Sequence, residues 1–168
     1  KYGKNSSQGT HLIFEEIHHP QNMIPARMAP LVFGGTILTH LCGGSAGREG
    51  TSIQITTTLA YQFNRFFKVT QAERKILLKA GIGAGFGAAV GAPWAGAIFG
   101  IEVVSGGKLR LNSLFQCVIA SFVGYFVTYL LHAPHSQYSF SNIPNLNLYT
   151  IALIALAGVI FGLTARLF

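Results

Sequence analysis

Three long stretches of this 168-residue sequence carry no charged side chain. They cover residues 28–47, 80–101 and 111–165, and only two histidines interrupt the last of them. Only 10% of the residues are charged and half are hydrophobic, whereas roughly 25% charged residues are typical of a soluble domain. A soluble domain could not cover its surface with these stretches, and a disordered chain would not contain them. The composition therefore predicts an all-α, polytopic membrane protein.

The charges that remain are mostly basic and gather between the apolar segments, giving a net charge of +7. One connector holds Arg65, Lys68, Arg74, Lys75 and Lys79. This distribution fits the positive-inside rule better than a nucleic-acid groove, so we expect a multi-pass protein of the cell membrane, a bacterial inner membrane, and no nucleic-acid partner. Cys42 and Cys117 lie in apolar stretches and read as buried hydrophobes. We expect no metal, no cofactor and no enzyme activity, because no ligand cluster or nucleophile–base pair is visible.

Several apolar segments are too short or too broken to cross about 30 Å of hydrocarbon. Full-length spans are predicted over 28–47 and 114–131, and a further span begins at 148. A short, threonine-rich helix is predicted over 51–67, and two apolar pieces over 76–90 and 93–104 are separated at Gly91-Ala92-Pro93. Interrupted helices at membrane depth are tolerated only inside protein or beside a polar cavity, and they are typical of transport sites.

The glycines between 81 and 91 do not form a dinucleotide-binding loop, because their order is not G-x-G-x-x-G and no strand pattern precedes them. They instead repeat every four residues, as Gly83, Gly87 and Gly91 on one face and as Gly81, Gly85 and Ala89 on another. Gly96 and Gly100 repeat this spacing. Such small-residue faces predict close helix–helix packing.

Glu49 is the only acidic residue between Glu16 and Glu73, and it lies between two apolar segments. A carboxylate at membrane depth costs several kcal/mol unless it is paired, hydrated or protonated, so a functional role is the default. The alternative is a local ion pair between Glu49 and Arg48 at a turn. Thr51 and Ser52 suit the first turn of a helix, whose unpaired N–H groups would form an anion site. A tethered glutamate would occupy that site when ionised and leave it when protonated, which would couple anion passage to protons.

Three segments in this order resemble the CLC family of chloride channels and anion/proton antiporters. They are Gly47-Arg-Glu-Gly-Thr51 followed by Ile53-Gln54, then Lys79-Ala-Gly-Ile-Gly-Ala-Gly-Phe-Gly-Ala-Ala, then Ala92-Pro93-Trp-Ala-Gly-Ala-Ile-Phe-Gly-Ile-Glu102. The resemblance implies that Glu49 is the gating and proton-accepting residue. It also implies that the helix start at Arg48, Glu49, Gly50 and Thr51 binds the anion.

The sequence departs from the chloride-transporting members at three places. Thr51 replaces the proline of the glutamate motif, Val103 replaces the inner proton glutamate, and Ser6 to His11 replaces the serine loop that contacts chloride. These departures look like the fluoride-exporting branch. Within the replaced loop the candidates for an anion contact are Ser7, Gln8, Gly9 and Thr10, and the sequence does not choose among them.

The resemblance implies that residues 1–168 are one transmembrane region, part of the first of two inverted repeats in a homodimer. The function it implies is fluoride/proton antiport across the bilayer. Chloride conduction or chloride/proton exchange is the alternative within the family. A non-transporting helical assembly protein is the alternative from another class.

The remaining polar residues are expected to have structural roles. Glu102 should pair with Lys108 or Arg110, and His40 should bond a neighbouring backbone carbonyl. Glu15 and Glu16 should be solvated. The hydroxyls of Thr56, Thr57 and Thr58 should bond to the preceding helical turn.

Overall fold

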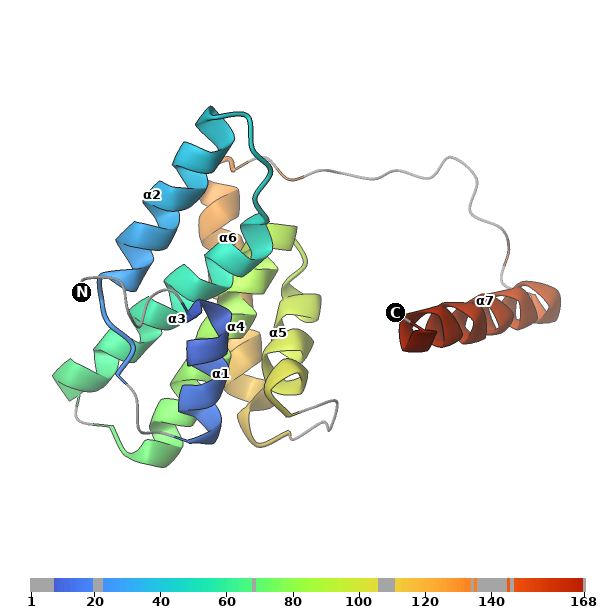
Figure 1. The fold of residues 1–168 in the computed structure, drawn as a ribbon. Helices are drawn as coiled ribbons and strands as arrows, with labels where there is room; N and C mark the ends of the chain where they lie inside the picture. The colour runs from blue at the N-terminus through green and yellow to red at the C-terminus, as the bar shows by residue number, and fades with distance from the viewer. Residues whose placement is uncertain are drawn as a thin grey trace. The chain divides into compact units, whose positions relative to one another are not determined.

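The computed structural model describes residues 8–19, 23–67, 69–105, 111–133, 135, 145 and 147–167, and every regular element in these ranges is helical, which confirms the all-α prediction (Figure 1). The chain divides into two compact units, residues 1–135 and 136–168, which are described separately. The first unit contains α1 (Thr10–His18), α2 (Met28–Leu41), α3 (Arg48–Phe67), α4 (Gln71–Val90), α5 (Pro93–Glu102), η2 (Val103–Ser105), η3 (Leu111–Ser113) and α6 (Leu114–Leu130). The second contains α7 (Leu148–Leu167).

Helices α3 and α4 form an antiparallel hairpin in which hydroxyls of one helix meet glycines of the other. The Ser52 hydroxyl donates to the Gly85 carbonyl at 2.8 Å, and the Thr56 hydroxyl lies 2.7 Å from the Gly81 carbonyl. A Cβ on Gly81 would lie only 3.0 Å from the Cα of Thr57. The four-residue spacing on both helices therefore forms a continuous seam, which we call the hydroxyl–glycine seam.

The opposite glycine face of α4 packs against α5 and α6. A Cβ on Gly83 would lie 3.0 Å from the Gly96 carbonyl, and a Cβ on Gly96 would lie 2.6 Å from both the Gly83 carbonyl and the Gly87 Cα. The Ser121 hydroxyl of α6 donates to the Pro93 carbonyl at the start of α5, at 2.8 Å. Both predicted small-residue faces are thus confirmed, and α4 lies at the centre of the unit (Figure 1).

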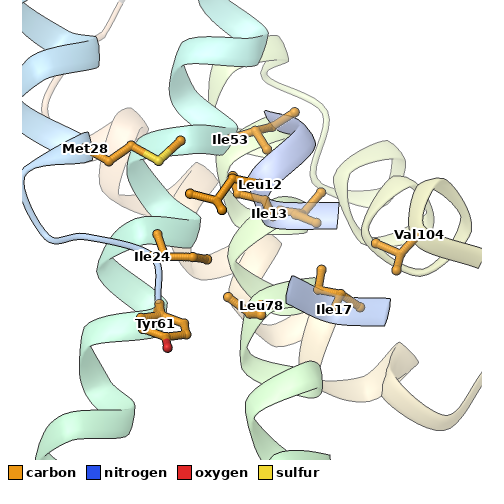
Figure 2. Packing of buried hydrophobic residues seen from close by; sticks show 10 residues of the cluster. Leu12, Ile13, Ile17, Ile24, Met28, Ile53, Tyr61, Leu78 and Val104 are labelled. Atoms are coloured by element: carbon orange, nitrogen blue, oxygen red, sulfur yellow. The ribbon is translucent and has the colours of Figure 1, made fainter. Parts of the chain in front are cut away.

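The short helix α1 packs against the other helices of this unit through a buried apolar cluster (Figure 2). The cluster contains Leu12, Ile13, Ile17, Ile24, Met28, Ile53, Tyr61, Leu78, Ile82 and Val104. It joins α1 to α3, α4 and η2, and so holds the beginning of α1 against the helix that carries Glu49.

Glu16 of α1 is buried, and the prediction that it is solvated is wrong. Its side chain is 1% exposed, and its Oε1 lies 3.2 Å from an Arg74 guanidinium nitrogen of α4. The guanidinium also lies over the Tyr61 ring, 5.8 Å from the centroid. A carboxylate of α1 and a cation from the basic connector thus meet inside the protein, because burial of a single charge would be far more costly than burial of the pair.

The helix boundaries differ from the predicted segments in several places, and α4 begins at Gln71, five residues before the predicted start. The full-length span predicted over 28–47 is wrong: α2 ends at Leu41 after 14 residues, about 21 Å. It ends because Gly43 takes a φ of +77°, a conformation that favours glycine, and Gly44 N donates to the Thr39 carbonyl at 2.8 Å. Helix α3 begins at Arg48, three residues before the predicted start.

Among the described residues, two helical segments are long and apolar enough to cross a membrane by length and composition: Leu111–Leu130, which includes α6, and Leu148–Leu167, which is α7. Helices α2 and α5 are apolar but shorter. The break predicted at Gly91-Ala92-Pro93 is confirmed, since α4 ends at Val90 with Gly91 in the left-handed conformation and α5 begins at Pro93.

Most smaller structural predictions are confirmed. His40 Nδ1 lies 2.8 Å from the Thr36 carbonyl, Cys117 is buried, and the hydroxyls of Thr56 and Thr58 lie 2.8 Å and 2.6 Å from the carbonyls four residues before them.

Two of these predictions are wrong. Cys42 is exposed, because it follows the early end of α2, and the Thr57 hydroxyl is buried without a hydrogen-bond partner among the described residues. Glu102 was expected to pair with Lys108 or Arg110, and both of these residues lie outside the described residues.

Candidate anion-binding site

A glycine-rich loop, residues 43–47, connects the end of α2 to the beginning of α3. A Cβ on Gly44 would lie 2.9 Å from the Thr39 methyl group, so the loop passes close to the last turn of α2. The loop ends at Gly47, immediately before Arg48. The loop therefore sets where the first turn of α3 lies.

The first turn of α3 contains Arg48, Glu49 and Gly50, whose backbone N–H groups have no carbonyl within the helix to bind. These groups and the helix dipole make the N-terminal end of α3 favourable for negative charge. Arg48 and Glu49 are exposed and Gly50 is partly buried. The first turn of α3 is therefore accessible at Arg48 and Glu49.

The Glu49 carboxylate lies beside Gly47, ahead of the helix. Its Oε2 would be 3.6 Å from a Cβ on Gly47, an ordinary contact distance. The side chain thus turns back over the N-terminal end of α3, where a tethered carboxylate would compete with a free anion. Within the described ranges, Glu49 makes no hydrogen bond or ion pair.

The Arg48 side chain is directed along α2. It lines a groove of about 290 Å³ between α2 and α3, together with Phe33, Thr36, Ile37, Thr51, Ser52, Ile55 and Thr56. The ion pair between Arg48 and Glu49, the alternative to a functional glutamate, is not formed in the described part of the chain.

Thr51 connects the start of α3 to α2. Its hydroxyl donates to the Gly47 carbonyl at 3.0 Å, and the Thr36 hydroxyl lies 2.9 Å away. Because Thr51 uses its only proton on Gly47, Thr36 is the donor in the second bond. A proline at position 51 could make neither bond, so the departure from the family motif adds a contact between two helices.

The loop with the other candidate anion contacts leads into α1. Gly9 precedes it with φ +56° and ψ −129°, which favours glycine, and Thr10 is its first residue. Thr10 Oγ1 accepts a hydrogen bond of 3.0 Å from the Gln54 side chain of α3. Gln8 is exposed, and Ser7 lies outside the described residues. Among the described residues of the loop, Gly9 and Thr10 lie next to Gln54 of α3.

The start of α1 is thus hydrogen-bonded to α3, the helix whose own first turn carries Glu49. Gln54 follows Glu49 by five residues, about 7.5 Å along the helix axis. Gln54 and Thr36 were not predicted as site residues. The signal that could have identified Gln54 is an amide side chain one and a half turns after the glutamate in a partly buried helix.

The sequence was compared with known proteins. Residues 1–168 match the family described as Voltage gated chloride channel. The chain is 40% identical over 166 residues to a "Chloride/fluoride channel protein" of Pseudomonas syringae pv. tomato, covering 99% of this chain and 37% of that protein. It is 31% identical over 147 residues to an "H(+)/Cl(-) exchange transporter" of Cronobacter sakazakii, covering 84% of this chain and 31% of that protein.

A third relative is a "Voltage-gated ClC-type chloride channel" of Salmonella dublin, 31% identical over 133 residues, with 79% of this chain and 31% of that protein covered. The chain thus spans about a third of the length of these curated relatives. The match over all 168 residues agrees with the helical fold and the membrane-length helices. The chain belongs to the voltage-gated chloride channel (CLC) family of membrane proteins, a family of channels and transporters rather than enzymes.

Proposed function

We propose that this chain is part of a fluoride/proton antiporter in which Glu49 is both the gate and the proton acceptor. The observation that carries the proposal is the position of Glu49 in the first turn of α3, with its carboxylate turned back beside Gly47. A residue that reaches the unpaired N–H groups of its own helix can block them reversibly. The proposed coupling to protons follows from this arrangement.

The exchange follows from the charge of the carboxylate. When ionised, Glu49 is attracted to the backbone N–H groups of the first turn and excludes a free anion from them. When protonated, it loses this attraction and the anion takes its place. Each exchange of carboxylate for anion at the N-terminal end of α3 therefore requires a proton to bind to or leave Glu49.

Fluoride is the proposed anion for two reasons. The chain is 40% identical to a relative whose name includes fluoride. Fluoride is also small and strongly hydrated, so a site for it must supply strong hydrogen-bond donors in place of water. Backbone N–H groups at Arg48, Glu49 and Gly50 are such donors, and the start of α1 at Gly9 and Thr10 is the proposed second set.

The whole protein is proposed to be longer than this chain. Residues 1–168 would form one transmembrane region within a multi-pass transporter of the cell membrane, assembled as a homodimer. The support is the share of the relatives' length that the chain covers and the two membrane-length helices. Lipid, protons and a halide would be its partners.

The test uses the full-length protein in liposomes loaded with sodium fluoride or sodium chloride. We expect fluoride to leave much faster than chloride, with protons moving in the opposite direction. Glu49→Gln cannot titrate, so it should abolish the proton movement while the protein remains folded. Equal fluoride and chloride fluxes would assign chloride transport instead. Normal fluxes of anion and proton in Glu49→Gln would overturn the role of Glu49, and no flux in the wild type would favour the assembly protein.

A further inference from the structure

The contact between α3 and the beginning of α1 is made by two polar side chains. Gln54 Nε2 donates to Thr10 Oγ1 at 3.0 Å, and both side chains are partly buried. Gly9 makes this approach possible: a Cβ at Gly9 would lie 3.3 Å from Gln54 Nε2, closer than most carbon atoms in proteins tolerate. The backbone at Gly9 is also in the left-handed region, with φ +56°.

The direction of this hydrogen bond determines what the Thr10 hydroxyl can do next. A threonine hydroxyl has one proton to donate and can accept from a donor through its oxygen lone pairs. Since Gln54 donates to Thr10, the hydroxyl proton of Thr10 remains available for another acceptor. The donated bond also polarises the hydroxyl and makes it a stronger donor.

Two threonines of α3 have a carbonyl of the preceding helical turn within reach of their hydroxyls. The Thr56 and Thr58 hydroxyls lie within hydrogen-bond distance of the carbonyls of Ser52 and Gln54, four residues before each of them. Thr10 is the first residue of α1, and within the described part of the chain its hydroxyl has no hydrogen bond other than the one from Gln54. The Thr10 hydroxyl is therefore placed to donate its proton beyond α1.

We propose that Gln54 is a positioning residue for anion binding: by donating to Thr10 Oγ1, it directs the Thr10 proton toward the transported anion. This inference rests on the proposed anion transport, and it identifies Thr10 as the member of the loop that contacts the anion. Gln54 also links the start of α1 to the helix that carries Glu49, so it sets the separation between the two anion-facing helix ends.

The test is a double-mutant cycle in the full-length protein, with fluoride and chloride efflux measured from liposomes. Thr10→Val and Gln54→Leu should each lower fluoride flux about tenfold, as expected for loss of a hydrogen bond to a charged group. Because Gln54 acts through Thr10, the double variant should also be lowered about tenfold rather than about a hundredfold. Thr10→Ser keeps the hydroxyl and should retain most of the flux.

Gln62→Leu is the matched control. Gln62 lies on the same helix, is also partly buried, and donates to the Ile24 carbonyl at 3.1 Å in the segment between α1 and α2. Its loss should weaken the packing without changing the fluoride-to-chloride flux ratio. An equal change of the ratio in Gln62→Leu would overturn the inference, as would independent effects of Thr10→Val and Gln54→Leu.

The outcome is separate from that of the proposed function. If the protein carries chloride in preference to fluoride, the same cycle is evaluated on chloride flux, and coupling between positions 10 and 54 still tests the inference. Thermal unfolding of each variant in detergent shows whether it remains folded. A well-folded Gln54→Leu protein with wild-type flux of both anions would overturn the positioning role.

Discussion

Two neighbouring helices of this protein begin with a glutamate in the first turn, and the two glutamates are treated differently. At the start of α4, the Glu73 carboxylate accepts hydrogen bonds of 2.7 Å from both the backbone nitrogen and the hydroxyl of Thr70. Thr70 in turn accepts from the Glu73 nitrogen at 3.3 Å, which completes a capping box. At the start of α3, Glu49 has no such partners among the described residues.

The difference follows from position and from the preceding residue. Glu73 is the third residue of its helix, the position from which a carboxylate can reach back to the cap, and Thr70 supplies the hydroxyl. Glu49 is the second residue of α3, and Gly47 before it has no side chain. The same residue type therefore caps the start of α4, whereas at the start of α3 it makes no hydrogen bond within the described part of the chain.

The largest expected effect comes from neutralising each glutamate in turn. Glu49→Gln should eliminate proton movement coupled to anion flux, since the proposed proton acceptor at the start of α3 is lost. Glu73→Gln should leave the proton-to-anion ratio unchanged, because its carboxylate is used within α4. Proton and fluoride electrodes on liposomes measure both. Loss of coupling in both variants would mean that the two glutamates are not functionally distinct.

Gly50→Ala should sharpen the comparison at α3, with a severalfold decrease in anion flux. Nothing lies within 4 Å of a Cβ at Gly50, and alanine favours a helix over glycine by up to about 1 kcal/mol, so the fold should not weaken. An anion bound at the Gly50 N–H group, however, would meet the added methyl group. A variant that is at least as stable and transports at the wild-type rate would place the anion elsewhere.

At the start of α4, Thr70→Ala should lower the free energy of unfolding by about 1 kcal/mol, the usual cost of losing a threonine cap. The flux per folded protein should not change, because Thr70 lies in the connector between α3 and α4 and not at the proposed site. Thermal unfolding in detergent and fluoride efflux measure the two quantities. A lowered flux at unchanged stability would contradict the structural role assigned to this helix start.

The smallest expected effect is the pH dependence of the Glu73 contribution. Hydrogen bonds from the backbone and side chain of Thr70 lower the pKa of Glu73 below its usual 4.5. Because the folded pKa is the lower one, the carboxylate stabilises the fold above the unfolded pKa, and this stabilisation is lost as the pH falls through the folded value.

The difference in thermal midpoint between wild type and Glu73→Gln should therefore shrink as the pH is lowered from about 7 to about 3. A difference that persists at the acidic end would mean that the Glu73 effect does not depend on ionisation. Gln62→Leu, which titrates no group, should show a constant difference across the same range.

The sequence predicted the packing of α4 well, because a four-residue repeat of glycines has few other uses in an apolar helix. It also predicted the break before Pro93, where proline has no backbone donor for a continuing helix. In both cases the cause is local and can be seen in a single segment. The resemblance placed Glu49 at a helix start, which the structure confirms.

The features that were missed depend on residues far apart in the sequence. Burial of Glu16 requires Arg74, 58 residues later, and neither residue alone indicates the pair. The bond between Gln54 and Thr10 joins residues 44 apart. The early end of α2 was missed for another reason: the apolar sequence continues past Leu41, but Gly43 and Gly44 turn the backbone out of the helix. Hydrophobicity alone does not detect that turn.

The hydroxyl–glycine seam has a consequence for how this protein is made. Helix α3 has 20 residues but does not meet the hydropathy expected of a membrane span, and its Ser52 and Thr56 hydroxyls bind carbonyls of α4 rather than lipid. Alone in a bilayer, α3 would lack these partners. During biosynthesis, α3 and α4 therefore enter the membrane most favourably as one hairpin, residues 48–90. Helix α3 would then move into the lipid only after α4 has been synthesised.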